Sequence, residues 1–284
     1  MTMLAAKAPF DFDATLRFLR GFPPTSGEQR VDRDSLTKAL RAGGQTLVAT
    51  LKAAEGGLEV SYAAAPTPAA EAEAADRLSF YLGLEDDLAE FYALGRSDAA
   101  FAPVVEALYG YHQVKFPSPL ENLVWAILCQ RVPMPVATKA KQALVAHVGN
   151  DRDAFPDLDQ LLSLDQDELT ALIGNTTKGA RLHAALRRWA ETDERHLRTA
   201  PYGEVKEFLQ SLPGIGPWSA SFILIRGLGR MDEAPVDREL LRSASAVYGP
   251  LSEDKARELA ATYGPWQGYW AHYLRAAGLV RRAA

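Results

Sequence analysis

A glycine-rich segment from Leu212 to Gly216 (LPGIG) separates two stretches whose apolar residues recur with helical periodicity. Its two glycines allow the backbone to adopt positive φ and to approach a bound anion closely. Because the second stretch begins with Pro217, its first amide groups are expected to lack intrahelical partners and to face a phosphate. A tight turn between two helices has the same composition, so the segment alone leaves both interpretations open.

A second candidate for chemistry is Asp237, which follows Trp218 by nineteen residues and directly precedes a predicted helix over residues 238–247. Asp is a common N-cap, and that role needs no function. A carboxylate at a helix N-terminus also stays ionised, and an ionised carboxylate can stabilise an oxocarbenium-like sugar and orient a water molecule. Asp237 is therefore a predicted helix cap whose carboxylate is also of the kind that cleavage of a glycosidic bond needs.

Aromatic side chains near these segments could form a pocket for a flat, positively charged group. Trp218 and Phe222 are four residues apart and share one face of their predicted helix, although such a pair is equally typical of a hydrophobic core. Trp125, Trp270 and Tyr273 are weaker pocket candidates, because core packing is the stronger interpretation for each of them.

The elements that must position these residues are predicted to be helices. From Ser118 onward the apolar residues follow a helical period, beginning with a capping box, Ser118 to Glu121 (SPLE), that has proline at the first helical position. The two stretches around the glycines form a predicted helical hairpin over residues 203–228. No strand pattern interrupts this part of the sequence.

The earlier part of the sequence has a different pattern. Apolar and polar residues alternate on both sides of Gly56 and Gly57, which predicts a β-hairpin over residues 46–63. A short helix is expected over residues 12–19, and another helix is expected to continue through Leu78 to Tyr92. The predicted fold is therefore an α+β N-terminal domain, residues 1–97, followed by an all-α domain, residues 98–284.

Composition limits the class of protein. The net charge of −5 argues against a broad electrostatic contact with nucleic acid, but residues 98–284 carry 21 basic and 22 acidic residues, which leaves room for a small one. Basic residues cluster there, for example Lys178, Arg181, Arg187 and Arg188. Cys129 is the single cysteine, which excludes an internal disulfide and a four-cysteine cluster. We find no signal peptide and no apolar stretch long enough to span a membrane, so a cytoplasmic protein is expected.

The run from Leu212 to Gly249 resembles the helix-hairpin-helix, Gly/Pro-rich loop and catalytic-Asp signature of the base-excision DNA glycosylases, the HhH-GPD superfamily. Within it, similarity to the bacterial 3-methyladenine DNA glycosylase II family extends to residues 12–19 (FDATLRFL), 126–130 (AILCQ) and 264–266 (GPW), and so covers nearly the whole chain. The resemblance implies a nucleoid-associated monomer that acts on double-stranded DNA containing damaged bases and requires no cofactor.

The resemblance also assigns roles to residues. It places the catalytic aspartate at Asp237 and base-pocket residues at Trp218 and Phe222, with Arg275 as a further pocket position. The expected DNA contacts are Gly214, Ile215, Gly216, Ser219, Gln130, Arg131 and Val132. A monovalent cation, Na⁺ or K⁺, is expected at the backbone carbonyls of Gln210, Leu212 and Ile215.

Two further expectations concern the reaction. Bifunctional members of the superfamily carry a lysine nucleophile at the position of Trp218, and without that amine no Schiff base can form there. We therefore expect a monofunctional N-glycosylase, without abasic-site lyase activity, that flips out and excises alkylated bases in base excision repair. The expected lesions are of the 3-methyladenine type, with 7-methylguanine and 1-methyladenine as further substrates.

Two departures from the family pattern bear on specificity. Arg131 occupies the position of a bulky residue that fills the gap left by the flipped base, and it could insert there or simply contact a phosphate. Arg275 occupies the position of an aromatic pocket residue, which predicts a wider site and a broader substrate range, including bases alkylated on the pairing edge.

Three alternatives stay open. The chain could be a glycosylase for other damaged or mismatched bases, or a non-catalytic helix-hairpin-helix module that only binds DNA. An O-glycoside hydrolase ranks lowest, because that reaction uses two carboxylates and only Asp237 stands out.

Overall fold

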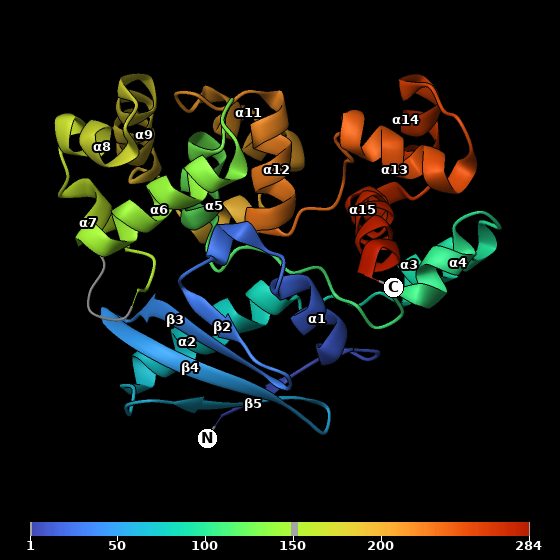
Figure 1. The fold of residues 1–284 in the computed structure, drawn as a ribbon, viewed down its shortest axis with the longest axis horizontal. Coiled ribbons are helices and arrows are strands. Elements are labelled where there is room, and N and C mark those ends of the chain that lie inside the picture. The colour runs from blue at the N-terminus through green and yellow to red at the C-terminus, as the bar shows by residue number, and fades with distance from the viewer. Residues whose placement is uncertain (1, 149–152, 284) are drawn as a thin grey trace.

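The computed structural model describes residues 2–148 and 153–283 (Figure 1). An antiparallel sheet of five strands in the order β1-β5-β4-β3-β2 forms one end of the molecule. Its strands are β1 (Thr2–Ala5), β2 (Gln29–Val31), β3 (Ser35–Ala42), β4 (Gln45–Ala54) and β5 (Gly57–Tyr62). The predicted hairpin over residues 46–63 is confirmed as β4 and β5, whereas β1, β2 and β3 were not predicted.

Two helices share a hydrophobic core with this sheet. Apolar residues of α1 (Phe12–Leu19) and α2 (Pro68–Leu82) cluster with the alternate, inward-facing residues of β3, β4 and β5, such as Leu36, Leu51 and Val60. The prediction of a helix over residues 12–19 is confirmed. An α+β N-terminal region follows from this packing.

The prediction of one continuous helix through Leu78 to Tyr92 is wrong, because the structure has two helices there. Gly83 has φ of 66° and caps the C-terminus of α2, so the chain turns there and a new helix, α3 (Ala89–Ser97), begins six residues later. Phe91 of α3 packs edge-on against Tyr273, with 4.9 Å between ring centroids. The division at residue 97 stays a prediction, but α3 belongs to the core of the C-terminal helices.

The described chain beyond α3 contains helices and no strand. These are α4 (Ala102–Ala107), α5 (Pro119–Leu128), α6 (Met134–Val148), α7 (Leu158–Leu162), α8 (Gln166–Ile173), α9 (Thr176–Trp189), α10 (Glu194–Thr199), α11 (Tyr202–Ser211), α12 (Pro217–Leu228), α13 (Arg238–Tyr248), α14 (Glu253–Ala261) and α15 (Gln267–Ala283), with 3-10 turns η1 (Pro23–Thr25) and η2 (Gly264–Trp266). Within the described ranges, no helix is long and apolar enough to cross a membrane.

Helix α5 lies at the centre of the helical region, and all ten of its residues are buried. The Ser118 hydroxyl accepts the Glu121 amide at 3.1 Å, which confirms the predicted N-cap, but the Glu121 carboxylate pairs with Lys141 and does not complete the predicted capping box. Helix α12 approaches α5 closely at Gly227, where a Cβ would lie only 2.9 Å from Asn122 Oδ1. This close approach fixes the helix that follows the glycine-rich turn against the buried core.

Buried charges connect the sheet region to these helices. The Lys141 ammonium of α6 donates to Glu121 of α5 at 2.7 Å and to the Pro24 carbonyl at 2.7 Å, and it also pairs with Glu28. Glu28 in turn pairs with Lys38 of β3 at 3.2 Å. All four charged side chains are at most 3% exposed, so each depends on its partners for stabilisation in place of water.

Candidate DNA-binding and catalytic site

The glycine-rich turn joins two helices, as predicted for residues 203–228. Helix α11 ends at Ser211 and α12 begins at Pro217, with Gly216 as its N-cap residue and Gly214 in the left-handed region at φ of 88°. The amides of Gly214 and Gly216 donate to no other group among the described residues. Two backbone N–H groups beside a helix N-terminus are therefore available to an anion.

Two other predicted DNA contacts, Ile215 and Ser219, lie in or next to this turn. The side chains of Ile215 and Ser219 are buried, so an anion at the turn would meet their backbone rather than their side chains. The Leu212 carbonyl accepts the Ile215 amide at 3.0 Å, and its second lone pair remains available. The turn is thus compatible with a cation at the carbonyls of Gln210, Leu212 and Ile215, which stays a prediction.

Asp237 is the N-cap of α13, and its two carboxylate oxygens have different partners. Oδ1 accepts the Leu240 amide at 2.8 Å, which closes the cap. Oδ2 accepts the Trp218 indole N–H at 3.1 Å and the Arg275 guanidinium at 3.0 Å. The structure therefore brings together three predicted site residues, Trp218, Asp237 and Arg275, from three different helices.

These partners determine the protonation state of Asp237. Partial burial alone would raise the pKa of its carboxyl group. The positive charge of Arg275, the Leu240 amide and the Trp218 indole outweigh burial and hold the pKa of Asp237 below its usual range. The side chain is thus ionised at neutral pH while 26% of its surface stays exposed.

Trp218 and Phe222 form an aromatic surface next to this carboxylate. Their rings are stacked, with centroids 5.4 Å apart and planes inclined by 9°. Trp218 is 47% exposed, which is unusual for so large an apolar side chain, and Phe222 is half-buried. A flat base could reach this surface without rearrangement of the core.

Arg226 continues the same face of α12 one turn further into the protein. Its guanidinium lies over the Phe22 ring at 4.9 Å, and its Nε and Nη2 atoms have no hydrogen-bond partner. Burial lowers the pKa of Arg226 to about 10. Burial together with the charges of Arg226 and Arg275 lowers the pKa of His272 well below its usual range, so His272 is neutral.

Three weaker pocket candidates are not at this surface, which corrects their assignment. Trp125 is 2% exposed in the core around α5. Trp270 is fully buried and donates to the Tyr248 hydroxyl at 3.0 Å, and the buried Tyr273 hydroxyl donates to the Tyr111 carbonyl at 2.7 Å. All three aromatic rings fill cores, as large apolar side chains usually do.

The segment between α5 and α6 is tied to the hairpin by Gln130. Its side-chain amide donates to the Gly214 carbonyl at 2.7 Å. The next residue, Arg131, has φ of 53°, an uncommon conformation for a residue with a side chain, and is exposed, whereas Val132 packs against the core. Met134 and Val136, which were not predicted as site residues, are about half exposed at the start of α6.

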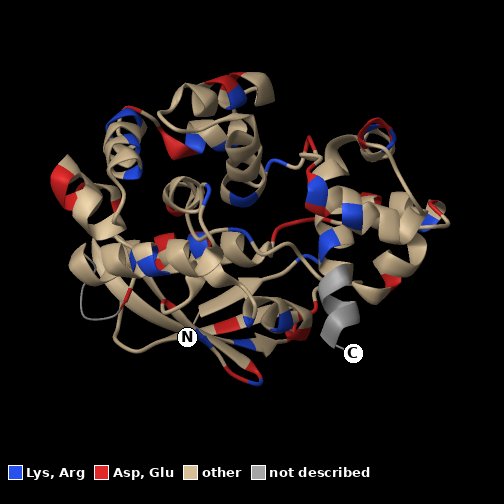
Figure 2. Cartoon of the chain, turned by 45° about the horizontal axis from the view of Figure 1, so that its top comes forward, with Lys and Arg blue, Asp and Glu red and all other residues tan. Residues whose placement is uncertain are grey.

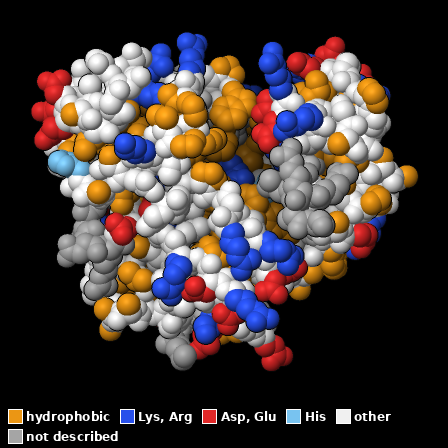
Figure 3. Space-filling model, viewed as in Figure 1, with side chains coloured by type: hydrophobic (Ala, Val, Ile, Leu, Met, Phe, Trp, Pro, Cys, Tyr) orange, Lys and Arg blue, Asp and Glu red, His pale blue; other side chains and the backbone are white. Residues whose placement is uncertain are grey.

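Space-filling and charge views show how apolar and charged residues are distributed over the molecule. Figure 3 shows apolar side chains gathered beside a hollow between the helical parts of the molecule, with basic side-chain atoms at its bottom. Figure 2 shows basic and acidic positions interspersed over the sheet and the helices. This distribution fits a small DNA contact rather than a broad electrostatic one.

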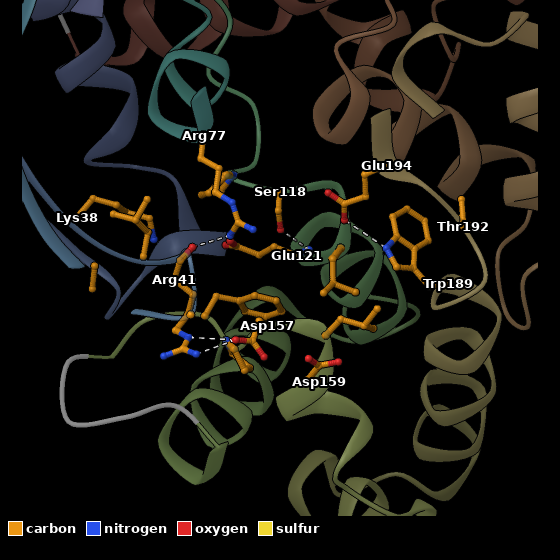
Figure 4. A pocket seen from close by; sticks show the side chains of 18 residues that line it. Lys38, Arg41, Arg77, Ser118, Glu121, Asp157, Asp159, Trp189, Thr192 and Glu194 are labelled. Carbon is orange, nitrogen blue, oxygen red and sulfur yellow. Dashed lines mark hydrogen bonds and ion pairs between the residues drawn. The ribbon is translucent and has the colours of Figure 1, made fainter. Parts of the chain in front are cut away.

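A separate cavity of about 400 Å³ lies between the sheet and the helices (Figure 4). Most of its charged residues already pair with protein groups: Arg41 contacts Asp157 at 2.8 Å, and Arg77 donates to the Arg41 carbonyl at 2.7 Å. The Glu194 carboxyl accepts the Trp189 indole at 3.3 Å, and burial raises its pKa. This cavity lies where the sheet region meets the helical region, and Asp237 does not line it.

No family model matches the chain. Comparison with individual proteins finds similarity to DNA glycosylases in both sequence and structure. DNA-3-methyladenine glycosylase from Bacillus subtilis (strain 168) is 23% identical over 207 residues, which are 68% of each protein. The structure of 3-methyladenine DNA glycosylase from Archaeoglobus fulgidus superposes with a TM-score of 0.81 and 21% identity over 100% of this chain and 99% of that one.

A glycosylase/lyase with a different substrate shares the same fold. The 8-oxoguanine glycosylase/lyase from Clostridium acetobutylicum superposes with a TM-score of 0.69 and 18% identity over 94% of this chain and 92% of that one. The fold alone therefore does not distinguish between these activities. The chain is thus similar in sequence to a DNA-3-methyladenine glycosylase and shares its fold with DNA glycosylases of differing activity.

Proposed function

We propose that this protein is a DNA glycosylase of base excision repair that releases alkylated bases of the 3-methyladenine type. The observation that carries the proposal is the position of Asp237: an ionised carboxylate lies within 3.1 Å of an exposed indole that stacks on a second ring. A flipped, positively charged base can stack on Trp218 and Phe222 while its sugar faces Asp237.

The reaction follows from this geometry. The bond between C1′ and the base nitrogen breaks, and its electron pair leaves with the base. A positive charge on an alkylated base makes that base a better leaving group. The ionised Asp237 stabilises the positive charge that develops on the sugar. A water molecule then adds its oxygen to C1′ and gives up a proton, which Asp237 accepts and passes to solvent.

We propose that the enzyme is monofunctional. Trp218 carries no amine, and its indole N–H donates to Asp237 at 3.1 Å instead. A lyase would need a nitrogen nucleophile at this place to displace the base and form a Schiff base. The product is then an intact strand with an abasic site, and the protein acts on double-stranded DNA as a monomer without a cofactor.

We also propose a broad range of alkylated substrates, including 7-methylguanine and 1-methyladenine. Arg275, at the position where the family has an aromatic pocket residue, pairs with Asp237 at 3.0 Å, so an arginine replaces an aromatic wall. Such a wall leaves more room around the edge of a stacked base.

The test compares base release and strand breakage in one assay. Duplexes carrying 3-methyladenine, 7-methylguanine, 1-methyladenine, hypoxanthine, ethenoadenine or 8-oxoguanine are incubated with wild-type protein, Asp237→Asn and Asp232→Asn. The Asp232 variant is the matched control, because it changes an exposed carboxylate in the same loop that pairs only at 3.5 Å with Arg230.

We expect the wild type and the Asp232 variant to release alkylated bases without strand breakage. Asp237→Asn keeps the cap, because Asn is as good an N-cap as Asp, but it should lose at least about 100-fold in rate. Strand breakage without added alkali would refute the monofunctional assignment. Release of 8-oxoguanine alone, or DNA binding without release of any base, would favour the alternatives.

A further inference from the structure

Arg181 of α9 lies beside the hairpin and has no role in the proposed reaction. Its Nη1 donates to the Gln130 side-chain oxygen at 3.2 Å, and the same Gln130 side chain donates to the Gly214 carbonyl at 2.7 Å. Helix α9 therefore contacts both the segment after α5 and the glycine-rich turn. The sequence places Arg181 in a basic cluster but predicts no role for it.

The stem of Arg181 passes across Gly214. A Cβ at Gly214 would lie 2.8 Å from Arg181 Cδ and 3.3 Å from its Cβ and Cγ, so the two residues are in close contact. The guanidinium is thereby held next to a turn whose Gly214 and Gly216 amides are free. Glycine is required at 214 for its φ of 88° and for this neighbour as well.

The start of α9 is itself fixed to the core. The Lys178 ammonium, one turn before Arg181, donates to the Leu128 carbonyl at the end of α5 at 2.5 Å. Burial lowers the pKa of Lys178, and this hydrogen bond compensates for part of the desolvation. Because this anchoring point is buried, Arg181 projects from a rigid part of the helix.

Arg181 also lacks an acidic partner. Among the described residues, no carboxylate lies within 4.0 Å of its guanidinium, whereas Arg188 on the same helix pairs with Glu191 at 3.3 Å. A guanidinium has five N–H donors, and the hydrogen bond to Gln130 uses one of them. The remaining donors of an exposed side chain are free to bind an anion.

We propose that Arg181 is a phosphate contact of the DNA surface, adjacent to the hairpin amides, and that it also positions Gln130. The inference rests on the proposed function, since it takes DNA as the partner. The hairpin amides supply only partial charges, and a chain with a net charge of −5 needs particular basic side chains at the strand it holds. Arg181 supplies a full charge at that place.

The experiment measures DNA binding separately from base release. Fluorescence anisotropy follows a duplex that carries an uncleavable tetrahydrofuran abasic analogue, with KCl varied from about 50 to about 200 mM. The proteins are the wild type, Arg181→Gln, Arg181→Lys and Arg187→Gln. Arg187→Gln is the matched control. It removes the same charge from the same helix, six residues after Arg181, at an exposed residue that contacts His183.

The logarithm of the association constant falls linearly with the logarithm of the salt concentration, and loss of one phosphate contact makes this slope shallower by about 0.9. We expect this change, with affinity lower by roughly tenfold at the lowest salt, for Arg181→Gln only. Arg181→Lys keeps the charge and should keep the slope, but it should release bases more slowly from saturating DNA, because a lysine cannot form the same contact with Gln130.

Each outcome decides the proposal. An unchanged slope and affinity for Arg181→Gln overturn the phosphate contact, and so does an equal loss for Arg187→Gln, which would indicate a general effect of charge. A slope that falls equally for Arg181→Gln and Arg181→Lys would point to structural damage and also overturn it. If the wild type binds DNA but releases no base, the proposed function fails while the binding result for Arg181 still stands.

Discussion

Replacement of Arg275 by methionine removes the charge that holds Asp237 ionised while keeping much of the side-chain volume. Arg275 Nη2 lies 3.0 Å from Asp237 Oδ2, and each side chain is 26% exposed. The pair is partly shielded from water, so its attraction is weaker than in a dry interior but stronger than between fully exposed residues.

The size of the effect follows from the distance. At 3.0 Å and an effective dielectric constant of about 20, the Coulomb attraction is about 5 kcal/mol. Desolvation and partial exposure reduce it to a coupling of about 1.5–3 kcal/mol, which is usual for a hydrogen bond between charged groups. Arg275→Met also relieves repulsion between Arg275 and Arg226, so a single variant underestimates the pair.

A double-mutant cycle isolates the coupling. Unfolding by urea at neutral pH is measured for wild type, Arg275→Met, Asp237→Asn and the double variant, and the Asn side chain preserves the N-cap in both backgrounds. Repulsion between Arg275 and Arg226 is present in both proteins that keep Arg275, the wild type and Asp237→Asn. It therefore cancels when the coupling energy is calculated from the cycle. A coupling below about 0.5 kcal/mol would contradict the ion pair.

The pH dependence gives a second readout with a fixed sign. Because Arg275 holds the pKa of Asp237 below its usual range, the carboxylate stays ionised as pH falls until that lowered pKa is reached. Without Arg275 the pKa rises, so the acid limb of kcat/KM must move to higher pH. An acid limb that stays in place or moves to lower pH would refute the role assigned to this pair.

Three further predictions concern the surface, the core and the turn. Trp218→Ala should weaken lesion binding by about tenfold in competition assays and lower the unfolding free energy by about 1–2 kcal/mol, less than for a buried tryptophan, because the ring is 47% exposed but stacks on Phe222 and donates to Asp237. Lys141→Met should destabilise the protein by about 3–5 kcal/mol in urea titrations, since Glu28 and Glu121 lose a common buried partner, and Lys141→Arg should retain part of that stability. Gly214→Ala should cost about 1–3 kcal/mol and weaken DNA binding, because φ is 88° and a Cβ would meet a neighbouring arginine at 2.8 Å; Gly203→Ala, which meets no atom, is the control.

The sheet shows which strands can be predicted from a pattern. Strands β4 and β5 alternate apolar and polar residues around a two-glycine turn, and both were predicted. Strand β3 was missed because its pattern contains Lys38. A lysine usually marks an exposed position, but this one is 1% exposed and paired with Glu28. The partner lies in a different segment, so the burial of this charge depends on tertiary structure.

The site shows the same division between local and distant information. Trp218 and Asp237 were selected from spacing and resemblance, and their side chains meet at 3.1 Å. Arg275 was predicted only as a pocket position, because nothing in the sequence indicates that its guanidinium reaches a carboxylate thirty-eight residues away. Arg181 was missed for a related reason, since its contacts with Gln130 and Gly214 join segments that are distant in sequence.

The two interpretations of Asp237, helix cap and catalytic residue, use different atoms of one side chain. Oδ1 is occupied by the Leu240 amide and sets the start of α13, while Oδ2 faces Trp218 and Arg275. The cap therefore fixes the orientation in which Oδ2 is presented, and a longer Glu side chain could not keep both positions at once. For this reason Asp237→Glu, which keeps the charge, should lose activity as Asp237→Asn does. In urea unfolding, Asp237→Asn should lose the ion pair with Arg275 but keep the cap, whereas Asp237→Glu should lose the cap of α13, at a cost of about 0.5–2 kcal/mol.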